Sequence, residues 1–184
     1  MNFYSNFDDF LLEKNGFTHN VLLYKLNIPG WENIINSIDK EDIWKIENTE
    51  LPGIPGGYQL YPHVTLLYNL RNTNINKIGS LISTLEPIKF EINGINIFRT
   101  SKGYDVLKMS VKPTEELLYI HQIFKDIFHT NSNDDYTPHI TIAYLKEGTA
   151  LKYVDYEYKN IIYSDTIIYS LKSGYQLEFK IDAK

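Results

Sequence analysis

Two pairs of residues in the chain have the types and spacing needed for acid-base chemistry: His63 with Thr65, and His139 with Thr141. Histidine has an unperturbed pKa of about 6.5, so it can accept or donate a proton near neutral pH. Two histidines can take a proton from an attacking oxygen and deliver one to a leaving oxygen, as phosphodiester cleavage requires. Threonine hydroxyls can donate hydrogen bonds to the non-bridging phosphate oxygens. The four residues therefore predict a catalytic site that needs no metal.

The segments around the two pairs form a weak internal repeat. Residues 62–68 read PHVTLLY and residues 138–144 read PHITIAY, with four of seven positions identical and two aliphatic exchanges. A lone His-x-Thr on a strand is usually a half-buried polar pair without a catalytic role. The second copy, with the same proline, tyrosine and aliphatic positions, makes a catalytic role the better interpretation. We expect two similar lobes related by an approximate two-fold axis.

Strands and helices in alternation are predicted to position these side chains. Residues i and i+2 of a strand lie on one side, so each motif should present its histidine and threonine together and bury Val64, Leu66, Ile140 and Ile142. Hydrophobic periodicity predicts strands at 20–28, 63–70, 88–92, 107–111, 139–145, 161–171 and 175–181, and helices at 31–38, 75–85 and 114–128. Gly94 should mark a bulge and Thr114 should cap a helix. The predicted fold class is α+β, with residues 1–184 forming one domain.

Composition excludes several function classes. The 18 Lys+Arg and 23 Asp+Glu residues give a net charge of −5, which argues against a long nucleic acid as partner and leaves room for a small anionic ligand. The chain has no cysteine, hence no thiolate nucleophile and no Cys-based zinc site. No segment approaches the ~20 apolar residues of a membrane span, and Asp8 and Asp9 are unlike a secretory signal. We expect a cytoplasmic protein without a membrane contact or a cofactor.

Two His-x-Thr motifs, each on a strand and several dozen residues apart, resemble the 2H phosphoesterase superfamily. The resemblance covers residues 20–145 and implies a bilobed fold with two pseudo-symmetric lobes of antiparallel sheet, helices outside and a central active-site cleft. It implies metal-independent action on 2′,3′-cyclic phosphates or on 2′,5′- and 3′,5′-linked oligonucleotides. It also implies acid-base catalysis by His63 and His139, with Thr65 and Thr141 on phosphate.

Within that superfamily, residues 20–29, Trp31, the acidic segment 39–42 and residues 61–68 are most similar to the phage anti-CBASS enzymes. Those enzymes degrade the cyclic di- and trinucleotides that bacteria use as antiviral signals. The resemblance implies attack of a ribose 2′-hydroxyl on the adjacent 3′,5′-phosphate, in the cytoplasm of a bacterial host. Two alternatives remain open: an RNA-end 2′,3′-cyclic phosphodiesterase similar to 2′,5′ RNA ligases, and a non-catalytic protein that sequesters a nucleotide.

Further residues are candidates for substrate contact because a nucleotide needs a flat surface for its base. Tyr58 and Tyr61 enter the first motif and Tyr136 precedes the second, which makes them the best-placed stacking partners. Arg99 and Lys146 could supply positive charge near phosphate, although solvated cations are the simpler interpretation of both.

The remaining histidines show no pattern of metal ligands. His121 and His129 lie eight residues apart without a His-Glu-x-x-His motif or an acidic cluster, so we expect solvated side chains and no metal site there. The chain also lacks a phosphate-binding Gly-rich loop followed by Lys and Ser or Thr, and a Gly-x-Ser-x-Gly elbow. Triphosphatase and α/β-hydrolase chemistry therefore have no support.

Overall fold

The computed structural model describes residues 20–44, 61–70, 74–101, 103–128, 136–171 and 175–183. Its strands are β1 (Asn20–Lys25), β2 (His63–Leu70), β3 (Ile88–Arg99), β4 (Tyr104–Val111), β5 (His139–Lys146), β6 (Asp155–Ser164), β7 (Thr166–Ser170) and β8 (Gln176–Lys180). Its helices are α1 (Trp31–Asn36), α2 (Ile75–Ile82), α3 (Glu115–Phe128) and the 3-10 helix η3 (Thr149–Tyr153). The elements follow the order that the sequence predicts up to β5, after which the chain has one strand more than predicted.

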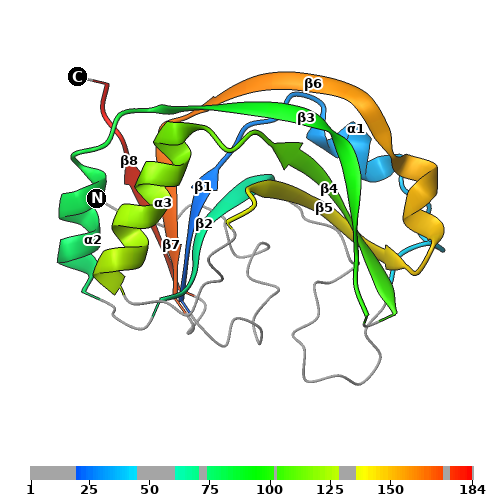
Figure 1. The fold of residues 1–184 in the computed structure, drawn as a ribbon, viewed down its shortest axis with the longest axis horizontal. Coiled ribbons are helices and arrows are strands. Elements are labelled where there is room, and N and C mark those ends of the chain that lie inside the picture. The colour runs from blue at the N-terminus through cyan, green and yellow to red at the C-terminus, as the bar shows by residue number, and fades with distance from the viewer. Residues whose placement is uncertain are drawn as a thin grey trace.

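The strands form two four-stranded antiparallel sheets. The first sheet has the order β2-β1-β7-β8 and the second has the order β5-β4-β3-β6. Figure 1 shows the two sheets joined in an arch, with β2 and β5 side by side beneath the longer β3 and β6. We call the part built on the first sheet the first lobe and the part built on the second sheet the second lobe. The predicted bilobed α+β fold is confirmed.

The chain crosses between the lobes near residue 165, where the sequence predicts one strand over 161–171. That prediction is wrong: β6 ends at Ser164 and pairs with β3, whereas β7 begins at Thr166 and pairs with β1 in the other sheet. The Ser164 hydroxyl donates to the carbonyl of Lys25 at 2.7 Å and so ties the crossing to the end of β1. Apolar alternation continues through the crossing, and periodicity alone cannot reveal a change of sheet.

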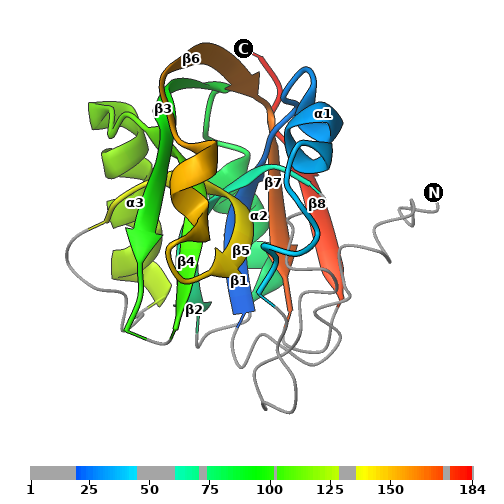
Figure 2. The same ribbon diagram turned by 90° about the vertical axis from the view of Figure 1, so that its right-hand side faces the viewer.

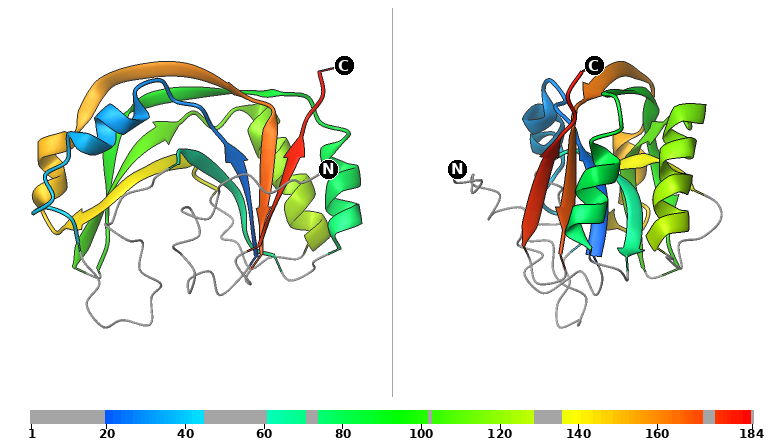
Figure 3. Two further views of the ribbon diagram at one scale, coloured as in Figure 1. Left: turned by 180° about the vertical axis from the view of Figure 1, so that it is seen from behind. Right: turned by 90° about the vertical axis from the view of Figure 1, so that its left-hand side faces the viewer.

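The helices lie outside the sheets, at the two ends of the arch. Figure 3 shows α2 and α3 together on one side of the first sheet, where α3 contacts β2 and Gly79 of α2 approaches the ring of Phe179 in β8. Figure 2 shows α1 and η3 at the opposite end, beside the second sheet. None of the described helices is long and apolar enough to cross a membrane.

Each motif strand lies at the edge of its sheet. The outer edge of β5, which carries the second motif, is covered by a segment that precedes the first motif in the sequence. The segment that follows α1 runs along β5: the amide of Trp44 donates to the carbonyl of Tyr144 at 3.0 Å, and the amide of Lys146 donates to the carbonyl of Asp42 at 2.8 Å. These bonds satisfy backbone groups that an open edge would leave unpaired. The two repeats therefore interlock.

One apolar core extends through both lobes. Val64, Leu66, Ile140 and Ile142 are all buried in it, which confirms their predicted inward orientation. Two predicted turn and cap residues are also confirmed. Gly94 has a φ of 87° at the register shift between Ile92 and Ile95, and a Cβ there would lie 3.1 Å from the backbone of Tyr156. The Thr114 hydroxyl accepts from the amide of Leu117 at 3.2 Å.

Candidate active site

The four motif residues project from the two edge strands at the junction of the lobes. His63 and Thr65 on β2, and His139 and Thr141 on β5, are half-buried, whereas the residues between them are buried in the core. Because β2 and β5 contact each other, this alternation brings both histidine-threonine pairs to the same junction. We call the faces of the two sheets that carry these four residues the motif face.

The two imidazoles are held in the same way. The Nδ1 of His63 donates to the carbonyl of Tyr61 at 3.2 Å, and the Nδ1 of His139 donates to the carbonyl of Thr137 at 2.9 Å. A carbonyl oxygen can only accept, so the bonded nitrogen carries the proton of the neutral ring. In this tautomer Nε2 is the ring nitrogen that can accept a proton. A shared backbone contact two residues upstream therefore sets the tautomer in both motifs.

The two motif strands also share an irregularity directly after the threonine. The register between β1 and β2 skips Leu66, and the register between β4 and β5 skips Ile142. An extra residue of this kind bends the strand, increases its twist and is common beside active sites. The internal repeat that the sequence predicts therefore extends to the backbone of the two motifs.

Burial governs the electrostatics of the two histidines. It lowers the pKa of His63 to about 4, against an opposing contribution from the Tyr61 carbonyl, and the charge of His139 lowers it further. Burial also lowers the pKa of His139, where the Thr137 carbonyl opposes the effect and the charge of Lys108 adds to it. Both rings are neutral at pH 7 in the free protein. The effect of His139 on His63 agrees with the contact between β2 and β5.

Two stacked side chains that precede the second motif in the sequence hold the strand of the first motif. The Nδ1 of His121 donates to the carbonyl of Leu66 at 2.7 Å, and the Tyr136 hydroxyl donates to the carbonyl of Thr65 at 3.0 Å. The two rings stack with centroids 4.0 Å apart and planes 2° from parallel. These donors satisfy carbonyl groups on the outer edge of β2. The pair fixes the backbone that carries Thr65.

His121 therefore differs from its prediction. The side chain is 6% exposed and not solvated, because α3 packs against β2 and turns the imidazole toward the strand edge. Burial lowers its pKa, so the ring is neutral. His129 lies outside the described residues. Within the described ranges, no three His, Cys, Asp or Glu side chains are grouped so that they could hold a metal ion.

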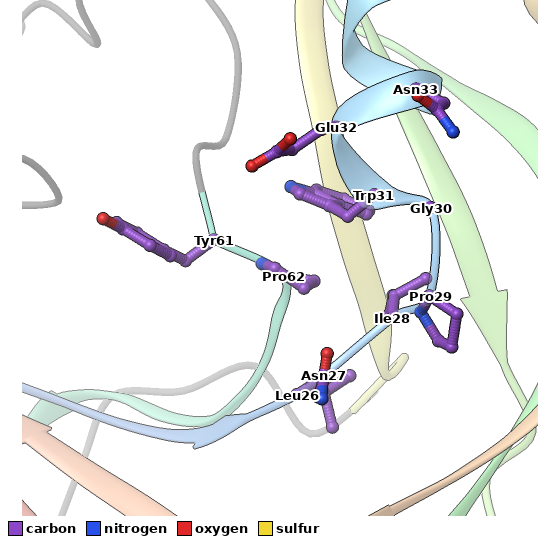
Figure 4. A pocket seen from close by; sticks show the side chains of 10 residues that line it. All are labelled: Leu26, Asn27, Ile28, Pro29, Gly30, Trp31, Glu32, Asn33, Tyr61 and Pro62. Carbon is purple, nitrogen blue, oxygen red and sulfur yellow. The ribbon is translucent and has the colours of Figure 1, made fainter.

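The three predicted stacking tyrosines have different surroundings. Tyr136 has one partner for its ring and one for its hydroxyl, which supports a positioning role, and its contact with a base stays a prediction. Tyr61 and Pro62 line a pocket of about 400 Å³ directly before the first motif (Figure 4). Trp31 and Glu32 of α1 line the other side of that pocket. Tyr58 lies outside the described residues.

The structure places the two candidate cations away from the motifs. Lys146 is the last residue of β5, seven residues after His139, which corresponds to roughly 20 Å along a strand. Arg99 ends β3 opposite Asp105, at the same end of the sheet. Both side chains are exposed, in agreement with the simpler interpretation of solvated cations.

Sequence reasoning missed a polar group on the motif face of the second lobe. Lys108 lies directly opposite Thr141, and Ser110 lies directly opposite His139. The Asn96 side chain donates to the Ser110 hydroxyl at 3.0 Å. A charged residue between Leu107 and Met109, in the middle of an apolar strand, was the signal that could have identified the lysine.

Comparison with known protein families identifies the family to which the chain belongs. The family described as the 2′-5′ RNA ligase superfamily matches residues 37–182, most of the sequence. The chain belongs to this superfamily of 2H phosphoesterases and is an enzyme that acts on phosphodiester bonds. Comparison with curated proteins gives no match.

Solved structures of distant proteins share the fold. Usb1 of Kluyveromyces marxianus aligns with a TM-score of 0.59 at 9% identity, over 90% of this chain and 99% of that one. Escherichia coli LigT in its apo form aligns with a TM-score of 0.55 at 14% identity, over 89% of this chain and 94% of that one. The protein TT0787 of Thermus thermophilus aligns with a TM-score of 0.58 at 12% identity, over 91% and 100%.

Proposed function

We propose that this enzyme is a metal-independent phosphodiesterase that cleaves 3′,5′-linked cyclic oligonucleotides, with His63 and His139 as its acid-base pair. The observation that carries the proposal is the matched orientation of the two imidazoles. The Nδ1–H of each ring donates a hydrogen bond to the carbonyl two residues upstream, at the junction where β2 meets β5. Binding alone does not require two proton-transfer groups in the same tautomer.

The reaction follows from this arrangement. The Nε2 of one histidine takes the proton of a ribose 2′-hydroxyl while O2′ attacks the adjacent phosphorus. The P–O5′ bond breaks as the other histidine, in its protonated form, delivers its proton to O5′. The products are a 2′,3′-cyclic phosphate and a 5′-hydroxyl. Water can then attack the cyclic phosphate with the two histidines in exchanged roles. Thr65 and Thr141 donate hydrogen bonds to the non-bridging oxygens.

Three features support a small cyclic substrate. Residues 20–29, 39–42 and 61–68, together with Trp31, resemble the phage anti-CBASS enzymes. The net charge of −5 does not favour a contact with a long phosphate backbone. The pocket of about 400 Å³ beside Tyr61 and Trp31 has the size of a site for part of a small molecule. We propose a countermeasure to CBASS-type immunity that acts in the cytoplasm of a bacterial host.

A second candidate is an RNA-end 2′,3′-cyclic phosphodiesterase, which is also favoured by a specific observation. Structures of the two relatives hold nucleotides: Escherichia coli LigT with 3′-AMP and Kluyveromyces marxianus Usb1 with uridine monophosphate. The same histidine pair would open a cyclic phosphate at an RNA end by the second step alone. A non-catalytic nucleotide-sequestering protein is the third candidate, and turnover of either substrate would exclude it.

One experiment separates the candidates. Purified protein in excess EDTA is incubated with 3′,3′- and 2′,3′-linked cyclic dinucleotides, a cyclic trinucleotide and an RNA with a 2′,3′-cyclic phosphate end. The products are resolved by chromatography. We expect linear products from the cyclic oligonucleotides, and none from the variants His63→Ala and His139→Ala.

Other outcomes would change the assignment. Processing of the RNA end alone would select the second candidate. Binding of a cyclic oligonucleotide without turnover would select the sequestering protein. Cleavage that persists in both histidine variants would contradict the proposed mechanism.

A further inference from the structure

Lys108 is a cation buried in the second sheet. Its residue is 7% exposed, and none of the described carboxylates lies within 4.0 Å of its ammonium group. Burial lowers the pKa of this lysine. A buried charge is unfavourable unless it is paired, so a lysine at this position costs stability. Such a cost suggests that the charge has a role in function.

The surroundings of Lys108 offer donors and few acceptors. Its Nζ donates to the Ser110 hydroxyl at 3.3 Å, and the Asn96 amide donates to the same oxygen at 3.0 Å. With its oxygen occupied by two donors, the hydroxyl of Ser110 has its own proton to give. The exposed ring of Phe98 lies 6.0 Å from Nζ and also favours a cation. The ammonium has three protons, and Ser110 accepts one.

This group of donors adjoins the catalytic pair of the second lobe. In an antiparallel sheet, residues directly opposite each other project to the same side, with Cβ atoms about 5 Å apart. Lys108 is opposite Thr141 and Ser110 is opposite His139, so their side chains share the motif face. The bond from Nζ to Ser110 directs the ammonium toward His139. The effect of its charge on His139 agrees with this direction.

We propose that Lys108, supported by Ser110 and Asn96, binds a non-bridging oxygen of the phosphate that reacts between His63 and His139. The ammonium neutralises the charge that grows on the phosphate oxygens in the transition state, in a site from which much of the water is excluded. The proposal rests on the proposed function only in taking a phosphate as the ligand. It adds a cation to the site that the His-x-Thr pattern does not contain.

The test is the binding of inorganic phosphate, monitored by 31P NMR, to the wild-type protein and to Lys108→Met, Lys108→Arg and Lys159→Met. Met keeps an unbranched side chain up to the ε position but has no ammonium group, and Arg keeps the charge. Lys159 is an exposed lysine on the far edge strand of the same sheet, so its variant matches the change in net charge. We expect Lys108→Met to weaken binding about tenfold or more, as loss of a charge-assisted hydrogen bond predicts. The other two variants should bind as the wild type does.

The remaining outcomes decide against the proposal. Wild-type affinity in Lys108→Met, an equal loss in Lys159→Met, or no phosphate binding to the wild type would each overturn it. Thermal unfolding serves as the control for folding, because removal of an unpaired buried charge should not lower the unfolding temperature. If Lys108→Met does unfold earlier, Lys108→Gln, which can still donate to Ser110, must show the same loss of binding. Because inorganic phosphate carries no nucleoside, failure of the cyclic-oligonucleotide assignment would leave this result unchanged.

Discussion

The two lobes present the same histidine-threonine pair in different surroundings. Both motif strands are edge strands, and both histidines donate a hydrogen bond from Nδ1 to the carbonyl two residues upstream. In both strands the pairing register skips the residue after the threonine. Opposite Thr65 stands Leu23, which packs with Val21 and Ile168 in an apolar cluster. Opposite Thr141 stands Lys108. The histidine-threonine pair occurs in both lobes, while the residues opposite it differ.

The difference suggests that the two halves of the site have different tasks. Opposite His63, Lys25 forms an ion pair with Glu178 at 3.0 Å, so its charge is already compensated. Opposite His139, Ser110 accepts from Lys108 at 3.3 Å. We therefore expect the charged side of the substrate to face the second lobe. The apolar wall of the first lobe is suited to an uncharged part of the ligand.

The largest effect should come from removing either of the two motif histidines. His63→Ala and His139→Ala should each lower kcat about a thousandfold or more, because one step needs a base and an acid together. The double variant should be no slower than the slower single variant, since the two groups act as a unit. Steady-state rates with matched circular-dichroism spectra would check this. Independent losses that multiply would contradict a shared step.

Removing the threonine hydroxyl should affect kcat/KM differently in the two lobes. We expect Thr65→Val to lower kcat/KM by about a hundredfold, as for loss of one oxyanion donor. Thr141→Val should cost only about tenfold, because Lys108 and Ser110 remain beside the same phosphate. Val keeps the shape of Thr, and each activity is compared with that of the wild type at saturating and limiting substrate. Equal losses in the two variants would show that Lys108 does not compensate.

The pH dependence of stability follows from the three histidines whose pKa is lowered by burial. Burial lowers the pKa of His63 to about 4, and it lowers the pKa of His121 and His139 below their usual value of about 6.5. The unfolded chain therefore binds protons that the native protein does not. Stability should be complete above about pH 6.5 and should fall as the pH drops toward about 4, by an amount on the order of 2 kcal/mol. Urea unfolding between about pH 7.5 and about pH 5 would measure this, before most carboxylates titrate. A constant free energy of unfolding over this range would contradict it.

The smallest effect concerns the contact that holds the first motif from the other repeat. Tyr136→Phe removes the hydrogen bond to the Thr65 carbonyl and should lower the free energy of unfolding by about 1 kcal/mol, with a modest loss of kcat. Tyr163→Phe is the matched control, because that side chain is 69% exposed on β6. Chemical denaturation of the two variants provides the comparison. An equal loss of unfolding free energy in the two variants would show that the hydrogen bond to Thr65 does not stabilise the protein.

Local patterns in the sequence predict the motif strands well. Alternation in residues 63–70 and 139–145 places the histidines and threonines on one face and the aliphatic residues in the core, as the structure shows. Gly94 and Thr114 were identifiable because a bulge and a helix N-terminus have their own residue preferences. The internal repeat predicts two lobes because similar segments form similar strands.

Contacts between distant segments could not be predicted in the same way. His121 appeared solvated because its burial depends on α3 packing against β2, 55 residues earlier in the chain. Lys108 was overlooked because only the register of β4 with β5 places it opposite Thr141. The crossing at Asp165 was missed because apolar alternation does not show which sheet a strand joins. In each case the information lies in pairing, which one sequence does not display.

The central claim is that His63 and His139 act as an acid-base pair without a metal. The most direct test is the pH profile of kcat/KM for a cyclic dinucleotide in excess EDTA. Catalysis needs one histidine protonated and the other neutral, and in the free protein the pKa of each lies below about 6.5. We therefore expect a bell-shaped profile with its maximum below about pH 6.5. Loss of activity in EDTA, or a rate that rises steadily into the alkaline range, would contradict the account.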